Sequence, residues 1–198
     1  MKIPVPYVPD NLSPEQTRLL DAVCEAHQKA ALTNKNVSSV TFMNVMMGSG
    51  RIENAMAAAI LSIGSMHAPI LEARGLYRMG QKEIVRMQLM RGHKIAGFGN
   101  SFYKTNIDPA WADVWSLLRI SFPKAAERIN EITGWLIEAG KPLYPNAAMF
   151  TAAACDICGI RGGTESSLFM LWRLPVWVNA MTEGWEEQTP DPSKLLKA

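Results

Sequence analysis

A glycine-rich turn near the middle of the chain carries groups suited to binding a ligand. The turn, Gly97-Phe98-Gly99, follows Lys94, and Lys104 comes a few residues later. Glycines let the main chain approach a bound molecule closely, and lysines beside exposed backbone N–H groups favour anions such as phosphates. The same pattern is also typical of a plain connection between two helices, so taken alone it does not separate a binding site from a linker.

Other reactive side chains have simpler structural interpretations. His67 lies among small and apolar residues, where a histidine is most often structural. Arg173 interrupts an apolar stretch, from which a long side chain can extend to the surface. Cys155 and Cys158 form a Cys-x-x-Cys pair with no second pair and no histidine at ligand spacing. Two small buried thiols are therefore favoured over a redox or zinc site.

The composition of the 198 residues excludes several classes of function. Hydrophobic residues make up 48% and charged residues 19%, which is typical of a globular protein. The net charge of +2 is too small to indicate binding to nucleic acid or to an anionic membrane. No apolar run reaches the roughly 18 residues of a membrane span, and residues 1–6 do not resemble a signal peptide. With an odd set of three cysteines, we expect a cytoplasmic protein without disulfides, metal or membrane contact.

The elements that must position these groups are helices. Ser13, Pro14 and Gln16 form a strong helix start, and that helix would run to about residue 32. Asp108-Pro109 and Asn146 predict two further starts, the second for a helix ending near residue 158. The remaining predicted helices cover residues 38–47, 51–66, 69–80, 83–91, 123–139 and 164–181. No useful alternating pattern predicts a strand, so the expected fold class is all-α.

We expect one helical domain with extended ends. Residues 1–12 hold three prolines and are predicted to form an arm, residues 13–188 the helical domain, and residues 189–198 an extended tail. The predicted helices 38–47 and 51–66 are rich in methionine and small apolar residues and poor in charge. They are too apolar for a surface, which favours burial on more than one side.

Several separated blocks of the chain, in matching order and spacing, resemble the citrate synthase and citryl-CoA lyase superfamily. They are an Asn-Val-Ser segment with a later histidine block, the glycine turn with its Tyr-Lys and Asp-Pro, a Pro-Asn pair, and a Leu-Phe…Arg ending. In this sequence the blocks are residues 36–41 with 62–69, 92–109, 143–146 and 168–183. The resemblance covers roughly residues 30–185. It implies a citrate-synthase-like helical bundle and a two-fold dimer built on the central small-residue helices.

The reaction implied by the resemblance makes or breaks a carbon–carbon bond beside a coenzyme A thioester. A carboxylate takes the α-proton, two histidines polarise oxygens, and arginines hold carboxylates. The resemblance places His67 in the first histidine position and Arg173 in a carboxylate-binding position. It places Asn100 where the second histidine stands and Ala148 where the aspartate base stands. Asparagine cannot shuttle a proton at neutral pH, and losing a general base costs on the order of 10² to 10⁴ in rate, so ordinary citrate synthesis or cleavage is not expected.

The coenzyme A side of the resemblance is better preserved. In the family the glycine turn offers main-chain groups to the adenine, and basic residues meet the phosphates. The corresponding residues here are Lys94, Ile95, Ala96, Gly97, Phe98, Gly99 and Lys104.

The sequence leaves open whether this chain is an enzyme. One hypothesis is an acyl-CoA-dependent synthase or lyase that uses His67, Asn100 and Arg173 on a non-standard substrate. The other is a non-catalytic binding or assembly protein that keeps the helical dimer and meets other protein chains.

Overall fold

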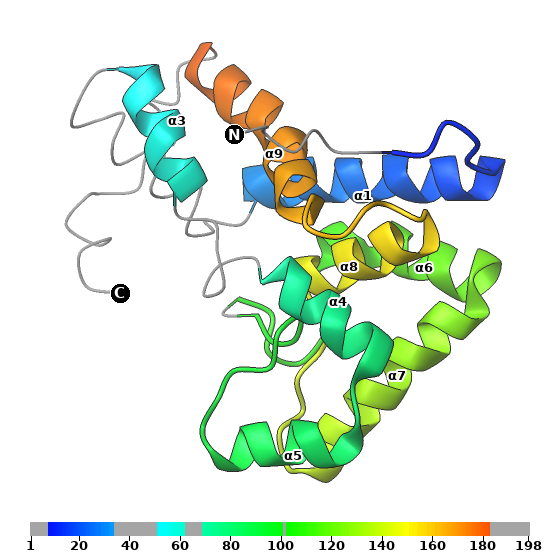
Figure 1. The fold of residues 1–198 in the computed structure, drawn as a ribbon. Helices are drawn as coiled ribbons and strands as arrows, with labels where there is room; N and C mark the ends of the chain where they lie inside the picture. Colours follow the sequence, from blue (N-terminus) through cyan, green and yellow to red (C-terminus); the bar gives the residue numbers. More distant parts are fainter. Residues whose placement is uncertain (1–7, 34–50, 62–68, 101, 183–198) are drawn as a thin grey trace.

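The computed structural model describes residues 8–33, 51–61, 69–100 and 102–182, and the regular elements within these ranges are helices joined by turns and loops (Figure 1). In these ranges no strand forms, and one isolated β-bridge joins Phe98 to Pro145. The prediction of an all-α fold is confirmed. The elements in order are α1 (Pro14–Thr33), α3 (Ile52–Leu61), α4 (Ile70–Met79), α5 (Lys82–Met90), η1 (Pro109–Trp111), α6 (Ala112–Ser121), α7 (Pro123–Glu138), α8 (Ala147–Ile157) and α9 (Glu165–Thr182).

Local capping groups set several helix starts where the sequence predicts them. At α1 the Gln16 N–H donates to Ser13 Oγ at 3.2 Å, and the Ser13 N–H donates to Gln16 Oε1 at 2.8 Å. This reciprocal pair is a capping box, which satisfies two donors that a helix end leaves open. At η1 the Asp108 carboxylate accepts from the Ala110 N–H at 2.9 Å. The first two predicted starts are therefore confirmed with their capping residues.

The helix predicted over residues 164–181 is α9, which begins one residue later, at Glu165. Thr164 directly precedes it, and its hydroxyl donates to the Arg161 carbonyl at 2.7 Å. The helix 38–47 and the part of the helix 51–66 beyond residue 61 lie outside the described residues. So do most of the predicted arm and all of the predicted tail.

Helix α8 is the centre of the molecule. Each of its residues from Ala148 to Cys155 is buried, because α1, α4 and α9 all pack against it. In Figure 1, α1 crosses above α8, and α9 packs against α1. The small side chains of α8 explain this arrangement, since alanines let neighbouring helices approach closely while Met149 and Phe150 fill the remaining space.

Helices α5, α6 and α7 extend this core in one direction. α7 lies between α6 and α5, and its apolar stripe is buried at Ala126, Ile129, Ile132 and Leu136, as its sequence pattern predicts. α5 is more loosely held, because Val85 is its only buried residue. Trp111 at the start of this unit stacks on Phe150 of α8, with ring centroids 5.5 Å apart.

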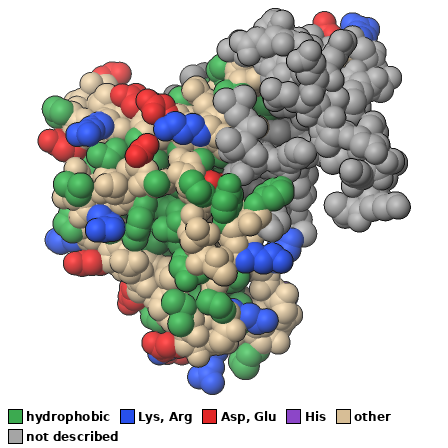
Figure 2. All heavy atoms as spheres, turned by 180° about the vertical axis from the view of Figure 1, so that it is seen from behind, with side chains coloured by type: hydrophobic (Ala, Val, Ile, Leu, Met, Phe, Trp, Pro, Cys, Tyr) green, Lys and Arg blue, Asp and Glu red, His purple; other side chains and the backbone are tan. Residues whose placement is uncertain are grey.

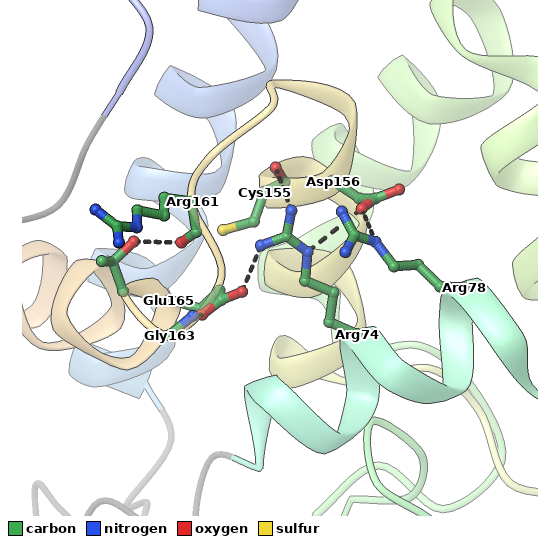
Figure 3. Close-up of polar contacts among 8 residues, drawn as sticks. Arg74, Arg78, Cys155, Asp156, Arg161, Gly163 and Glu165 are labelled. Carbon is green, nitrogen blue, oxygen red and sulfur yellow. Dashed lines mark hydrogen bonds and ion pairs between the residues drawn. The ribbon is translucent and has the colours of Figure 1, made fainter.

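A buried cluster of charges ties α4 to the end of α8 and the start of α9 (Figure 3). Arg74 on α4 pairs with Glu165, and its Nε lies 3.3 Å from Asp156 Oδ1. A third guanidinium contact reaches the Cys155 carbonyl at 3.3 Å. Burial acts to lower the pKa of Arg74, but hydrogen bonds and charge from Glu165 and Asp156 outweigh it and raise that pKa. The cluster therefore holds a fully charged arginine inside the protein.

Candidate functional site

The glycine turn has a backbone that only glycine adopts easily. Gly97 and Gly99 have φ angles of 83° and 85°, in the left-handed region that L side chains rarely enter. Gly97 also lies against two helices: a Cβ there would be 3.0 Å from both the Ala73 and the Met149 Cβ atoms. Its small size therefore lets the turn sit directly on α4 and α8.

Hydrogen bonds join the turn to the Pro-Asn segment that opens α8. The Gly99 N–H donates to the Tyr144 carbonyl at 2.8 Å, and the Asn146 N–H donates to the Gly97 carbonyl at 2.9 Å. The Asn146 side chain completes the connection, with Nδ2 donating to the Gly99 carbonyl at 2.8 Å and Oδ1 accepting from the Ala148 N–H at 3.0 Å. Two blocks more than 40 residues apart in sequence thus form one unit.

The amide group of Asn146 lies between two positions that the sequence marks as catalytic. One side of the amide binds Gly99, directly before Asn100, and the other binds the backbone of Ala148. Ala148 is buried, so its methyl group packs in the core. One Asn146 side chain thus bonds both the main chain of Ala148 and that of the residue before Asn100.

The orientation of the Asn100 amide follows from its own loop. The Phe102 N–H donates to Asn100 Oδ1 at 2.8 Å, and only the oxygen of an amide can accept. Nδ2 therefore points away from this bond as a hydrogen-bond donor. A half-buried Asn100 oriented in this way can donate to an oxygen of a ligand but cannot take up a proton.

The other predicted residues of the turn divide into anchors and exposed groups. Ile95 and Phe98 have buried side chains in the main core, so they could contact a ligand only through the main chain. Lys94 and Lys104 are exposed and Ala96 is half-buried. Within the described residues, the turn's own hydrogen bonds use Gly97 O, Phe98 N and both main-chain groups of Gly99.

Arg173 is enclosed rather than open to solvent. It is 4% exposed, its Nε donates to His27 Nδ1 at 3.3 Å, and its guanidinium lies 4.2 Å from the Phe169 ring centroid. Burial lowers the pKa of Arg173 to about 9, while the negative charge of Asp108 opposes the shift. The guanidinium is therefore still protonated at pH 7.

His27 is a buried polar residue that the sequence analysis missed. Because Arg173 can only donate, Nδ1 of His27 accepts, and Nε2 of the neutral ring carries the proton. Nε2 lies 2.8 Å from Thr151 Oγ1, and the Thr151 hydroxyl donates to the Ala147 carbonyl at 2.7 Å. Burial, assisted by the Arg173 charge, lowers the pKa of His27 well below its usual value, so the ring is neutral. One signal was present in the sequence, since His27 continues the apolar stripe of Val23 and Ala30 on α1.

The remaining candidates are structural or lie elsewhere. His67 lies outside the described residues, so its relation to Asn100 and Arg173 stays a prediction. Asp156, two turns beyond Ala148, faces Arg74 and Arg78 instead of the glycine turn (Figure 3). Cys155 and Cys158 are free and buried, and burial raises the pKa of their thiols to about 12 and about 11. In the described part of the chain no group of metal-ligating side chains assembles, and none of its helices has the length and apolar character of a membrane span.

Comparison with solved structures shows what this arrangement of helices is. The citryl-CoA lyase of Hydrogenobacter thermophilus superposes with a TM-score of 0.71 at 20% identity, over 88% of this chain and 71% of that one. The citrate synthase of Pyrobaculum aerophilum gives 0.67 at 23% identity, over 88% and 46% of the two chains. This chain has the citrate synthase fold. No family model and no curated protein matches its sequence.

A third match shows how much of the citrate synthase fold is present. The citrate synthase of Thermoplasma acidophilum, solved with carboxymethyl coenzyme A and oxaloacetate, gives a TM-score of 0.68 at 19% identity. The match covers 96% of this chain and 58% of that one, so the chain spans about half the length of the citrate synthases it matches. The predicted resemblance is confirmed at the level of the fold, and at such identities the reaction needs its own argument.

Proposed function

We propose that this chain binds a coenzyme A thioester at the glycine turn and does not perform ordinary citrate synthesis or cleavage. The observation that supports binding is the pair of Asn146 side-chain hydrogen bonds that connect the turn to the start of α8. These bonds restrain the conformation of the turn before a ligand arrives, and such pre-organisation lowers the entropy cost of binding.

The ligand's adenine would contact the main chain of residues 94–96 other than the Ile95 carbonyl, which accepts from the Phe98 N–H. The Gly97 carbonyl and both main-chain groups of Gly99 already form hydrogen bonds with the segment before α8. Exposed Lys94 and Lys104 would meet its phosphates. The Asn100 amide would donate to the thioester or to a neighbouring carbonyl oxygen, since its Oδ1 is occupied by the Phe102 N–H. Chemistry beyond binding would lack its base, because Ala148 stands in the core at that position.

Calorimetric titration with coenzyme A and acetyl-CoA tests this proposal. We expect binding, and we expect Lys94→Gln to weaken it about threefold to tenfold, since one charge-assisted contact is lost. Lys124→Gln, which removes an exposed lysine from the first turn of α7, is the matched control and should leave the Kd unchanged. Absence of heat at millimolar ligand would remove the proposal. Turnover of acetyl-CoA or citryl-CoA in the same samples would instead favour an active enzyme that uses His67, Asn100 and Arg173.

We also propose that the chain forms a homodimer through α3. Leu61 on α3 is 84% exposed and Ala57 is exposed beside it, which is unusual for a helix built from apolar residues. The face seen in Figure 2 also carries hydrophobic side chains at its centre, which form a second candidate surface for the dimer. A test of the dimer must therefore distinguish α3 from other exposed apolar residues.

Gel filtration with light scattering at micromolar concentration should give a mass of twice 21.9 kDa. Leu61→Glu should reduce it to that of the monomer, because a buried charge opposes association. Met90→Glu on α5 is the control: Met90 is nearly as exposed as Leu61 but lies on another helix, so this variant should leave the dimer intact. A monomeric mass for the unmodified protein would contradict the proposal.

A further inference from the structure

We infer that His27 is a positioning residue for the glycine turn and acts through Thr151 and the first turn of α8. His27 lies on α1, and its hydrogen bonds go to Arg173 and Thr151 rather than to the turn. Hydrogen bonds from His27 to Thr151 and from Thr151 to Ala147, the peptide bond from Ala147 to Asn146, and the bonds of Asn146 to the glycines connect it to the turn. The inference rests on the proposed function only where it concerns ligand affinity.

The first part of this path runs across three helices. Arg173 on α9 donates to His27 on α1, and His27 donates to Thr151 on α8. The direction of each bond is fixed, because arginine has no acceptor and a neutral histidine has one donor nitrogen and one acceptor nitrogen. Thr151 then has its hydroxyl proton available for the Ala147 carbonyl.

The second part of the path lies within the site. Ala147 is the first residue of α8 and follows Asn146, whose side chain binds Gly99 and whose N–H binds the Gly97 carbonyl. A rotation of the first turn of α8 would therefore move both glycine contacts. By holding the Ala147 carbonyl, Thr151 and His27 restrict that rotation.

The surroundings of His27 make it a stiff support. Its ring is fully buried and makes edge contacts with Trp111 and Phe169 at centroid distances of 4.8 Å and 4.6 Å. Trp172 stacks on it at 5.4 Å. The imidazole cannot turn without displacing an aromatic ring, so the direction of its Nε2–H is set by packing.

The test compares two threonines that make the same local bond. Thr151→Val removes the hydroxyl that links His27 to Ala147. Thr133→Val on α7 removes a hydroxyl that donates in the same way, at 2.8 Å, to the carbonyl of Ile129, four residues earlier. His27 does not bond to this second hydroxyl, since its Nε2 faces Thr151. The measurement is amide hydrogen exchange, reported as the rate at Gly99 divided by the rate at Leu136 in α7.

We expect Thr151→Val to raise this ratio about tenfold and Thr133→Val to leave it unchanged, since about 1.4 kcal/mol of local restraint is lost only in the first. Equal acceleration of both amides in Thr151→Val would overturn the inference, because it would show a general loss of stability. Thr151→Ser keeps the hydroxyl and should retain the original ratio even if the protein is less stable. A tenfold rise in Thr151→Ser would also overturn it, and this variant decides the matter if Thr151→Val does not fold.

Coenzyme A titration of the same variants separates the two proposals. If the exchange ratio rises in Thr151→Val but no variant binds coenzyme A, the positioning role holds and the proposed ligand is wrong. If coenzyme A binds equally to Thr151→Val and the exchange ratio is unchanged, the ligand is supported and His27 is not a positioning residue.

Discussion

Replacement of Arg74 by methionine is expected to lower the free energy of unfolding by about 3–5 kcal/mol, the largest stability effect that we predict for a single side chain. Glu165, which is 1% exposed, would lose the guanidinium that neutralises it. Its other oxygen still accepts from the Gly163 N–H at 2.7 Å, but one hydrogen bond does not compensate for a buried charge. Because whole domains are stable by only about 5–15 kcal/mol, the urea midpoint should fall sharply.

The control for Arg74→Met is an ion pair on the surface. Lys82 pairs with Glu138 between α5 and α7, and the two side chains are 48% and 61% exposed. Lys82→Met should therefore cost less than about 1 kcal/mol. The double variant Arg74→Met with Glu165→Leu should recover much of the loss, because it removes both charges. An equal effect of Arg74→Met and Lys82→Met would show that the buried cluster adds nothing to stability.

Gly97→Ala is expected to destabilise the protein by about 2–4 kcal/mol and to disturb the candidate site at the same time. The left-handed backbone contributes about 1–2 kcal/mol, and the contact of the new Cβ with α4 and α8 contributes the remainder. Neither the Ala73 Cβ nor the Met149 Cβ can rotate away at 3.0 Å, so the two helices would have to separate. Thermal unfolding and coenzyme A titration of one preparation would measure both consequences.

Gly92 provides the matched comparison for Gly97. Its φ of 72° imposes a similar backbone strain, but a Cβ there would have no atom within 4 Å. Gly92→Ala should therefore cost only the backbone contribution of about 1–2 kcal/mol and leave the site unchanged. If both alanine variants lose the same stability, the close approach of the turn to α4 and α8 is not what makes Gly97 necessary.

The helices could be predicted from the sequence because their signals are local. Ser13 and Gln16 lie three residues apart, Asp108 lies two residues from the N–H that it caps, and Asn146 caps α8 at the same short distance. The apolar stripe of α7 repeats within single turns of the helix. Such features need no knowledge of the rest of the chain.

The polar interior could not be predicted because its partners are distant in sequence. Arg74 and Glu165 are 91 residues apart, and His27 and Arg173 are 146 residues apart. The resemblance marked Arg173 as a candidate for carboxylate binding, and the apolar stripe of α1 indicated that His27 is buried, but nothing in the sequence indicated that the two side chains meet. In the same way, Asn146 was recognisable as a capping residue but not as the bridge between Gly99 and Ala148.

The buried Cys-x-x-Cys pair makes the reaction rate of a native thiol a measure of how often the helices separate. Since thiol reagents attack the thiolate, and burial raises the pKa of Cys155 and Cys158 to about 12 and about 11, almost no reactive sulfur exists in the closed molecule at pH 7. Cys158 also lies 3.7 Å from the Gln16 carbonyl, against the first turn of α1. Modification of Cys158 therefore requires α1 to move away from the end of α8, and its rate would follow the frequency of that separation without any introduced label.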